Sequence, residues 1–413
     1  VTYHSYVMKK LILFFIFLWA VPLIFGQGWP QFRGPSGQGH ADAKGLPLNW
    51  NRVEGVAWEN KLSGKAWSSP ICVNDQIFLT NAVLDNDSLA LELISIDFNS
   101  GHIRWRKKLF EYDQQPRIHK KNSYASPTPF YDNGFIFVHF GNLGTACLDI
   151  DGAEIWKNKL NYLPVHGSGA SPVIVGDLLL LSADGANDPC LYALDKRTGE
   201  IKWKALRDSQ SKKNFSFCTP LVVEVKGEVQ IISPASDYVF SYDLQGNQLW
   251  KFNYPNGYSV VPRPVFDRGI VYVSSGYDSP TLYAIKCGGR GDITKSNLVW
   301  KTRKGAPRNS SLVVVNSLLF MVADNGVVSC LDSQTGELFW MERVAGSCSP
   351  SLLYSNGKIF LSDEMGKTFI FKASKSYALL ATNDLEERML ASPIAFKNSL
   401  LLRTENNLWR IDP

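Results

Sequence analysis

A tryptophan that follows a tight turn recurs along this chain at intervals of 40 to 51 residues. The stretch from Ala193 to Trp203 shows the repeated unit. An alternating strand leads into a turn in which Asp195 can accept amide hydrogen bonds and Gly199 can adopt a positive φ, and a second alternating strand carries the tryptophan. One hairpin cannot bury an indole alone, so neighbouring repeats must cover it. The recurring residues are Trp58, Trp105, Trp156, Trp203, Trp250, Trp300 and Trp340.

A second marker, a proline preceded by Ser, Thr or Arg, opens a strand in each repeat. A repeat of 40 to 50 residues with four short strands is typical of a propeller blade. The sequence therefore predicts an all-β fold, an eight-bladed β-propeller of four-stranded antiparallel blades. Ser310-Ser311-Leu312-Val313 occupies the one position without the proline, and the prolines are Pro70, Pro127, Pro172, Pro220, Pro264, Pro350 and Pro393.

The order of the strands predicts how the ring closes. Trp58 precedes the first inner strand, whereas the last repeat ends after its third strand at residues 408–413. We expect residues 56–60 to supply the missing outer strand of the last blade, because closure removes the exposed edges of an open array. Leu379-Leu380 stands where the eighth outer-strand tryptophan would be.

The chain divides into three predicted parts. Residues 1–26 are predicted to be a signal peptide, since Lys9-Lys10 precede an apolar run from Leu11 to Phe25 that is short for a membrane span. An uncleaved anchor is the alternative. Residues 27–51 are predicted to form a strap that packs its large aromatics on the ring, and residues 52–413 the propeller. No cysteine follows the apolar run, so a lipoprotein anchor is not expected, and the mature chain is predicted to be periplasmic or secreted, without a membrane span.

Charge and cysteine usage narrow the function classes. The formal net charge is +5 and becomes +3 when the predicted signal peptide is removed with Lys9 and Lys10. This charge is too small to argue for nucleic-acid binding, and we expect a monomer without a nucleic-acid partner. The seven cysteines are an odd number, and their spacing forms no disulfide framework or metal motif. Most lie in strand-like runs, where a cysteine serves as a small buried apolar residue.

The repeat resembles the tryptophan-docking motif of PQQ-like β-propellers, A-x-D-x-x-T-G-x-x-x-W. Ala193–Trp203 matches every fixed position, and Cys330–Trp340 differs only in Cys for Ala. The leader Trp29-Pro30-Gln31-Phe32-Arg33-Gly34-Pro35 also resembles the start of secreted PQQ-like repeat proteins. This resemblance implies either a quinoprotein alcohol dehydrogenase or a relative of the non-catalytic propeller subunit of the outer-membrane barrel-assembly machinery.

The loops between the outer strand of one blade and the inner strand of the next carry cationic and aromatic residues. Such loops converge on one face around the axis, where they favour an anionic ligand, with the aromatics as stacking faces. Ordinary solvated loops are the alternative. The candidate ligand-binding residues are Lys65, Trp67, Arg117, His119, Lys121, Asn122, Tyr124, His166, Lys212, Lys213, Phe215, Tyr258, Arg263, Arg308 and Arg388.

Catalytic and metal signals are sparse. His119 and His166 are the candidate general bases, but no nucleophile is evident beside either. Asp184 and Asp188 could hold Ca²⁺, although their spacing also suits a turn. Quinoprotein dehydrogenases use adjacent cysteines and a Glu, Asn and Asp set for PQQ and Ca²⁺. No two cysteines are adjacent here, and no such set can be assigned.

Two functions follow from these patterns. The first is a non-catalytic binding or scaffold propeller that recognises an envelope protein segment or an anionic small molecule or saccharide. The second is an enzyme, either a divergent PQQ-dependent oxidoreductase or a hydrolase that acts on an anionic saccharide. The repeat specifies the scaffold, so the function is expected in the loops that do not repeat.

Overall fold

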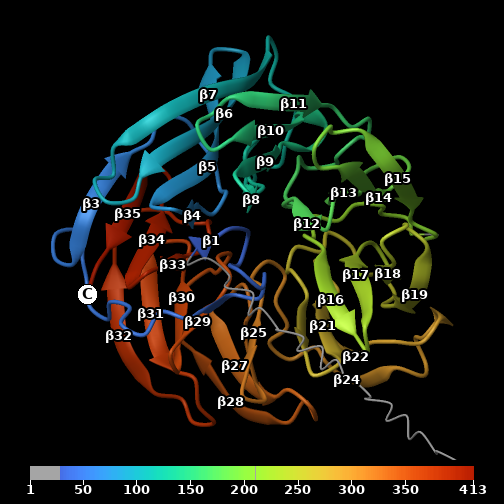
Figure 1. Cartoon of the computed structure of the whole chain (residues 1–413). Coiled ribbons are helices and arrows are strands. Elements are labelled where there is room, and N and C mark those ends of the chain that lie inside the picture. Colours follow the sequence, from blue (N-terminus) through green and yellow to red (C-terminus); the bar gives the residue numbers. More distant parts are fainter. Residues whose placement is uncertain (1–27, 210) are drawn as a thin grey trace, which may run out of the picture.

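Eight antiparallel sheets are arranged around a central axis in the computed structural model, which describes residues 28–209 and 211–413 (Figure 1). Each sheet is one blade with four strands that run from the axis outward, here called A to D. The predicted all-β, eight-bladed propeller is confirmed. The predicted signal peptide lies outside the described residues. Within the described residues no helix has the length and apolar character needed to cross a membrane.

The first four blades follow one another along the chain. Blade 1 comprises β4 (Ile71–Val73), β5 (Gln76–Asp85), β6 (Ser88–Asp97) and β7 (Ile103–Tyr112). Blade 2 comprises β8 (Phe130–Asp132), β9 (Phe135–His139), β10 (Thr145–Asp149) and β11 (Glu154–Asn158), with the 3₁₀ turn η1 (Gly141–Leu143) after β9. Blade 3 comprises β12 (Val173–Val175), β13 (Leu178–Ala183), β14 (Cys190–Asp195) and β15 (Ile201–Leu206). Blade 4 comprises β16 (Leu221–Val225), β17 (Glu228–Pro234), β18 (Tyr238–Tyr242) and β19 (Gln248–Asn253).

The remaining blades complete the ring. Blade 5 comprises β20 (Val265–Asp267), β21 (Ile270–Ser274), β22 (Leu282–Lys286) and β24 (Leu298–Thr302), and β23 (Gly291–Asp292) joins the edge of blade 4. Blade 6 comprises β25 (Val313–Val315), β26 (Leu318–Val322), β27 (Val327–Asp332) and β28 (Leu338–Arg343). Blade 7 comprises β29 (Leu353–Ser355), β30 (Lys358–Ser362), β31 (Lys367–Lys372) and β32 (Leu379–Asp384). Blade 8 comprises β33 (Ile394–Phe396), β34 (Ser399–Arg403), β35 (Asn407–Ile411) and β3 (Val56–Lys61).

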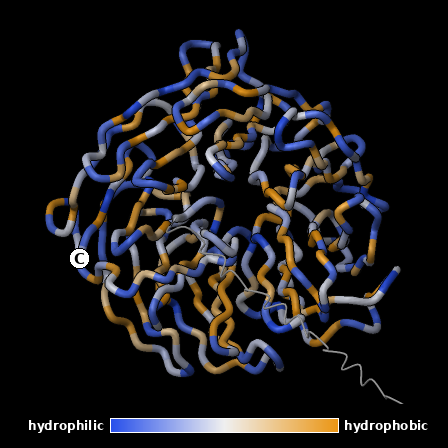
Figure 2. The backbone as a smooth tube through the Cα atoms, in the orientation of Figure 1, coloured by the Kyte–Doolittle hydropathy of each residue, from blue (hydrophilic) through white to orange (hydrophobic). Residues whose placement is uncertain are grey.

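Blade 8 joins the two ends of the propeller. Its outer strand β3 comes from the start of the propeller and pairs antiparallel with β35, with Val56 opposite Ile411 and Lys61 opposite Asn407. The prediction that the N-terminal strand completes the last blade is confirmed. The buried cores lie between neighbouring blades, and Figure 2 shows hydrophobic stretches along the strands of the ring.

A circle of hydroxyl groups links the inner strands. At the start of each A strand, a Ser or Thr oxygen accepts a hydrogen bond from the backbone N–H of the equivalent residue in the preceding blade. Seven of the eight links are present, with N to O distances of 2.9 to 3.1 Å. In blades 1, 3, 4 and 8 the hydroxyl residue directly precedes the marker proline, whereas Thr128 and Ser351 directly follow it. The members of the circle are Ser69, Thr128, Ser171, Thr219, Ser311, Ser351 and Ser392.

Arg263 takes the place of the hydroxyl in blade 5. Its guanidinium is 2% exposed and turns inward, where Nε donates to Pro220 O at 3.1 Å and Nη1 donates to Phe32 O at 2.6 Å. The sequence predicted Arg263 as a ligand-binding residue on the loop face. The structure instead shows it engaged by the N-terminal segment, because no hydroxyl stands at this position in the circle.

The N-terminal segment, residues 28–50, crosses the axis and then runs outward over blade 7, and its Trp29 and Trp50 are buried against the blades (Figure 1). Its strand β1 (Gly28–Trp29) pairs with β4 of blade 1, and β2 (His40–Ala41) pairs with β29 of blade 7. Between them, Arg33 donates to the carbonyls of Ser311 and Leu312 in blade 6. A methyl group at Gly37 would lie 2.5 Å from Nη1 of Arg263, so only glycine leaves room for this guanidinium. We call this segment the plug.

The repeated tryptophans dock one blade on the next. Trp203, on the outer strand of blade 3, lies over Gly246 of blade 4 and donates from Nε1 to Leu244 O at 3.0 Å. Two tryptophans are exceptions. Trp250 is fully buried and donates to Gln230 of its own blade. Trp105 lies over Gly152 of blade 2, and its Nε1 has no partner among the described residues. The same indole-to-carbonyl bond, at 2.9 to 3.0 Å, is formed by Trp58, Trp156, Trp300 and Trp340.

The docking predicts a difference between two glycines of blade 4. Gly246 and Gly227 both have φ near +80°, so alanine at either position costs about 1–2 kcal/mol of unfolding free energy. A methyl group at Gly246 would also lie 2.7 Å from Trp203 Cδ2, whereas nothing lies within 4 Å at Gly227. We expect Gly246→Ala to cost about 1–3 kcal/mol more than Gly227→Ala in denaturant unfolding, because it overpacks the contact.

Removal of the indole is the control for this prediction. In a Trp203→Ala background the two glycine substitutions should cost the same, because the group that clashes is gone. Equal costs in the wild-type background would show that the indole does not hold the two blades together.

Candidate functional site

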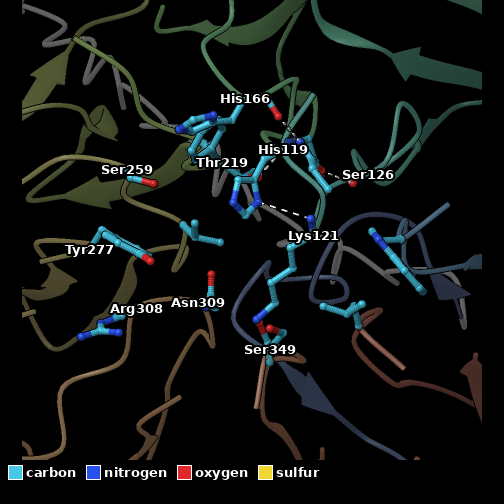
Figure 3. Close-up of a pocket in the computed structure, with 18 of the residues that line it drawn as sticks. His119, Lys121, Ser126, His166, Thr219, Ser259, Tyr277, Arg308, Asn309 and Ser349 are labelled. Atoms are coloured by element: carbon cyan, nitrogen blue, oxygen red, sulfur yellow. Dashed lines mark hydrogen bonds between the residues drawn. The ribbon is translucent and has the colours of Figure 1, made fainter. Parts of the chain in front are cut away.

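A cavity of about 790 Å³ lies on the axis, at the face where the D-to-A loops meet (Figure 3). The starts of the A strands surround its inner end, and Phe32 of the plug is among its lining residues. The plug therefore closes the channel below the cavity, and the opposite side is open to the loop face. A volume of this size is typical of small-molecule sites.

Nine of the predicted ligand-binding residues line this cavity. They come from the loops before blades 2, 3, 4, 5 and 6 and from the loop before blade 1, so the propeller does bring distant loops together. These nine are Trp67, His119, Lys121, Asn122, His166, Lys213, Phe215, Tyr258 and Arg308.

The other six predicted residues lie elsewhere. Lys65 and Arg388 both lie over the ring of Trp67 and both pair with Glu405, so they cover the back of a lining residue. Tyr124 donates to Pro116 O at 2.6 Å. Arg117 and Lys212 are exposed on the loops, and Arg263 lies under the inner end of the cavity.

One wall of the cavity is an arc of aromatic rings. His119, His166, Phe215, Tyr258 and Tyr277 follow one another with ring-centroid distances of 5.3, 5.2, 5.5 and 6.4 Å. The successive rings are inclined by 64°, 86°, 74° and 53°, so the first three pairs meet edge to face and the last pair is tilted. No two successive rings of the arc are parallel, and Phe217, which also lines the cavity, lies 6.5 Å from His166 at an interplanar angle of 32°.

Lys121 extends across the mouth of the cavity (Figure 3). Its loop precedes blade 2, yet its Nζ lies 2.6 Å from Glu364 Oε1 in blade 7, and Ser349 donates to the same oxygen at 2.7 Å. The backbone of the loop is held by His119 N, which donates to His166 O at 3.2 Å. The loop before blade 2 is therefore tied to both sides of the mouth.

The two predicted general bases, His119 and His166, both line the cavity. Burial, together with the nearby His119 and Arg117, lowers the pKa of His166, which favours a neutral imidazole at neutral pH. His119 Nδ1 accepts the N–H of Lys121 at 3.3 Å. Among the described residues, neither imidazole forms a hydrogen bond to a hydroxyl or thiol, the contact that activates a nucleophile.

The Ca²⁺ candidates do not form a cation site. Both oxygens of Asp184 accept hydrogen bonds from Arg207, at 2.9 and 3.2 Å, and both side chains are 1% exposed. Burial raises the pKa of Asp184, against the pull of the guanidinium. Asp188 has a positive φ of 42°, as in a turn. The acidic pattern at 184–188 thus reflects a buried ion pair and a turn.

The residues of the cavity do not fit PQQ with Ca²⁺ as quinoprotein dehydrogenases hold them. Asp324 is the single carboxylate among the lining residues, and it accepts bonds from the amides of Arg308 and Asn309 and from the Asn309 side chain. All seven cysteines are buried and unpaired. Across residues 28–209 and 211–413, no three His, Cys, Asp or Glu side chains are grouped to hold a metal ion.

Several residues of the site were missed in the sequence. Phe32 was expected on the surface of the ring, and only the path of the plug brings it to the cavity. The Ser/Thr-Pro marker lies at or next to the hydroxyls of the circle, but the sequence analysis interpreted the marker only as the start of a strand. Nothing in the sequence indicates that Lys121 reaches Glu364, which lies 243 residues further along the chain.

The family of the chain follows from comparison with known proteins. A family model described as outer membrane protein assembly factor BamB matches residues 92–341 and 289–376. The chain belongs to this family. The predicted membership of the PQQ-like propellers is confirmed.

Individual relatives agree with this family. The outer membrane protein assembly factor BamB of Moranella endobia is 24% identical over 301 residues, which cover 68% of this chain and 72% of that protein. The crystal structure of BamB from Moraxella catarrhalis has a TM-score of 0.61 at 14% identity, over 87% of this chain and 97% of that one. A europium-containing methanol dehydrogenase has a TM-score of 0.55 at 11% identity, over 92% and 90% of the two chains. At these identities the structures show a shared fold alone.

The tie across the mouth predicts a local effect of Lys121→Met. Its ion pair is partly exposed, with 37% of the Lys121 side chain and 16% of the Glu364 side chain accessible, so we expect a loss of less than about 1 kcal/mol of unfolding free energy. Hydrogen exchange of the amides in residues 117–122 should become faster, because the loop loses its contact to blade 7.

Lys108→Met is the matched control, since Lys108 pairs at 2.8 Å with Glu111 on the protein surface. It should leave exchange in residues 117–122 unchanged. Unchanged exchange in Lys121→Met would contradict a loop held across the mouth.

Proposed function

We propose that this protein is a non-catalytic protein-binding scaffold that takes part in the assembly of outer membrane proteins. It would work in the periplasm, to which the predicted signal peptide would deliver it. Membership of the BamB family supports this role, and so does the poor fit of the site to oxidoreductase or hydrolase chemistry. The partner is inferred to be a segment of an envelope protein.

Exposed apolar side chains around the cavity mouth are the observation that carries the proposal. Leu163 is 58% exposed, Tyr277 52% and Met365 68%, and Val165, which lines the cavity, is 38% exposed. Exposed apolar groups that gather within a polar rim are typical of protein interfaces.

Backbone hydrogen bonds place these residues on one face. Leu163, in the loop before blade 3, accepts from Ala186 N of a B-to-C loop at 2.9 Å. Glu364, next to Met365 in a B-to-C loop of blade 7, donates its N–H to Ser347 O at 2.8 Å in the loop before that blade. The D-to-A and B-to-C loops therefore share a face, and an extended segment lying across it would meet several of the apolar groups.

Site-specific photo-crosslinking in cells tests the proposal. A photoreactive amino acid at Met365 or Leu163 should crosslink to a component of the outer membrane assembly machinery, because both side chains point into solvent beside the mouth. Val53 is the control. It is 82% exposed and lies just before β3, at the end where Val56 faces Ile411, which is the face opposite the cavity.

A crosslink from Met365 or Leu163, but not from Val53, to such a component is the expected result. Equal crosslinking from both faces, or none to any component of that machinery, would contradict the proposal.

A further inference from the structure

We propose that the axial cavity binds an acidic saccharide, a sugar that carries a carboxylate. This inference concerns the inside of the cavity and does not rest on the scaffold role, which concerns the rim. Four features of the cavity support it: buried cations below its inner end, a guanidinium in its wall, hydroxyl donors at its inner end, and separate aromatic faces.

Two buried cations without carboxylate partners lie below the cavity. Arg33 is 3% exposed and Arg263 is 2% exposed, and both donate to backbone carbonyls or to the Gln31 side chain. Neither forms an ion pair with a described residue. Burial lowers the pKa of Arg263 to about 10. Burial and the repulsion from the charge of Arg263 lower the pKa of Arg33 to about 9. Both guanidinium groups therefore stay charged at neutral pH. Their charges make the potential in the cavity positive.

Arg308 offers a guanidinium in the wall itself. Its backbone N–H is held by Asp324 at 3.0 Å, and its guanidinium carbon lies 5.3 Å from the centre of the Tyr277 ring. Lys121 and Lys213 pair with Glu364 and Asp278, whereas the Arg308 side chain makes no ion pair within the described part of the chain. An unpaired guanidinium in a cavity is suited to bind a carboxylate in a bidentate manner.

The inner end of the cavity presents hydroxyl donors. Each oxygen of the circle already accepts one backbone N–H, which leaves each group its O–H donor and one further acceptor lone pair. None of these hydroxyls donates to another described protein atom. They would bind the oxygens of a ligand rich in acceptors, as a saccharide is. Those that line the cavity are Ser69, Thr128, Ser171, Thr219, Ser351 and Ser392.

The aromatic arc favours a sugar over a flat aromatic acid. A flat ring is best held between parallel faces, and the successive rings from His119 to Tyr277 are tilted by 53° or more. Single aromatic faces suit the C–H face of a sugar ring, which needs a stacking surface on one side. Since the plug closes the inner end at Phe32, the ligand is a short saccharide or the end of a longer one.

Isothermal titration calorimetry at low salt, with digalacturonate, maltose and sodium sulfate, tests the proposal. We expect digalacturonate to bind, and maltose and sulfate to bind at least about tenfold more weakly, because each lacks either the charge or the sugar face. Arg308→Gln should weaken digalacturonate binding at least about tenfold, and Arg308→Lys should weaken it less, because the charge is kept and the planar fork is lost.

Arg197→Gln is the matched control. It removes the same charge from an exposed site in a C-to-D turn, away from the cavity, where Arg197 pairs with Asp177. It should change the affinity less than twofold. No binding of digalacturonate, equal binding of maltose, equal binding of sulfate, or unchanged affinity in a folded Arg308→Gln variant would each overturn the proposal. These calorimetric outcomes do not alter the crosslinking expected from Met365 and Leu163, so failure of the saccharide proposal can be distinguished from failure of the scaffold role.

Discussion

The pairing of β3 with β35 is the constraint on which the other features of the structure depend. It brings the start of the propeller to its end. The plug precedes β3 in the chain, and its strands extend the inner strands of blades 1 and 7. Without closure at blade 8, the circle of hydroxyls would be interrupted between Ser392 and Ser69, and the cavity would have no complete wall.

The structure separates a repeated scaffold from a site that is not repeated. The indole contacts between blades and the hydroxyl links between inner strands recur around the ring, and they make the blades nearly equivalent. The cavity breaks that equivalence. Arg263 replaces one hydroxyl, Lys121 ties blade 2 to blade 7, and aromatic rings gather on the side of blades 3 to 5. These departures are where the proposed recognition is expected, since a fold does not determine a function.

The sequence could predict the scaffold because its signals are local. Asp195, Gly199 and Trp203 lie within one hairpin, and the turn and the alternation are visible without knowledge of distant residues. The site was only partly predictable. Loop position showed that His166 and Tyr258 face the axis, but side-chain direction depends on partners far along the chain. Arg263 turns inward to meet Phe32, which lies 231 residues away, and no local pattern reveals that contact.

Native-state hydrogen exchange directly measures whether β3 closes the ring. In the folded protein, the amides of β3 that pair with β35 should exchange slowly, at rates like those of the outer strand β15 in the middle of the chain. Exchange of residues 56–61 as fast as that of an unpaired segment would show that the ring is open. The closed ring on which the plug, the hydroxyl circle and the cavity depend would then be contradicted.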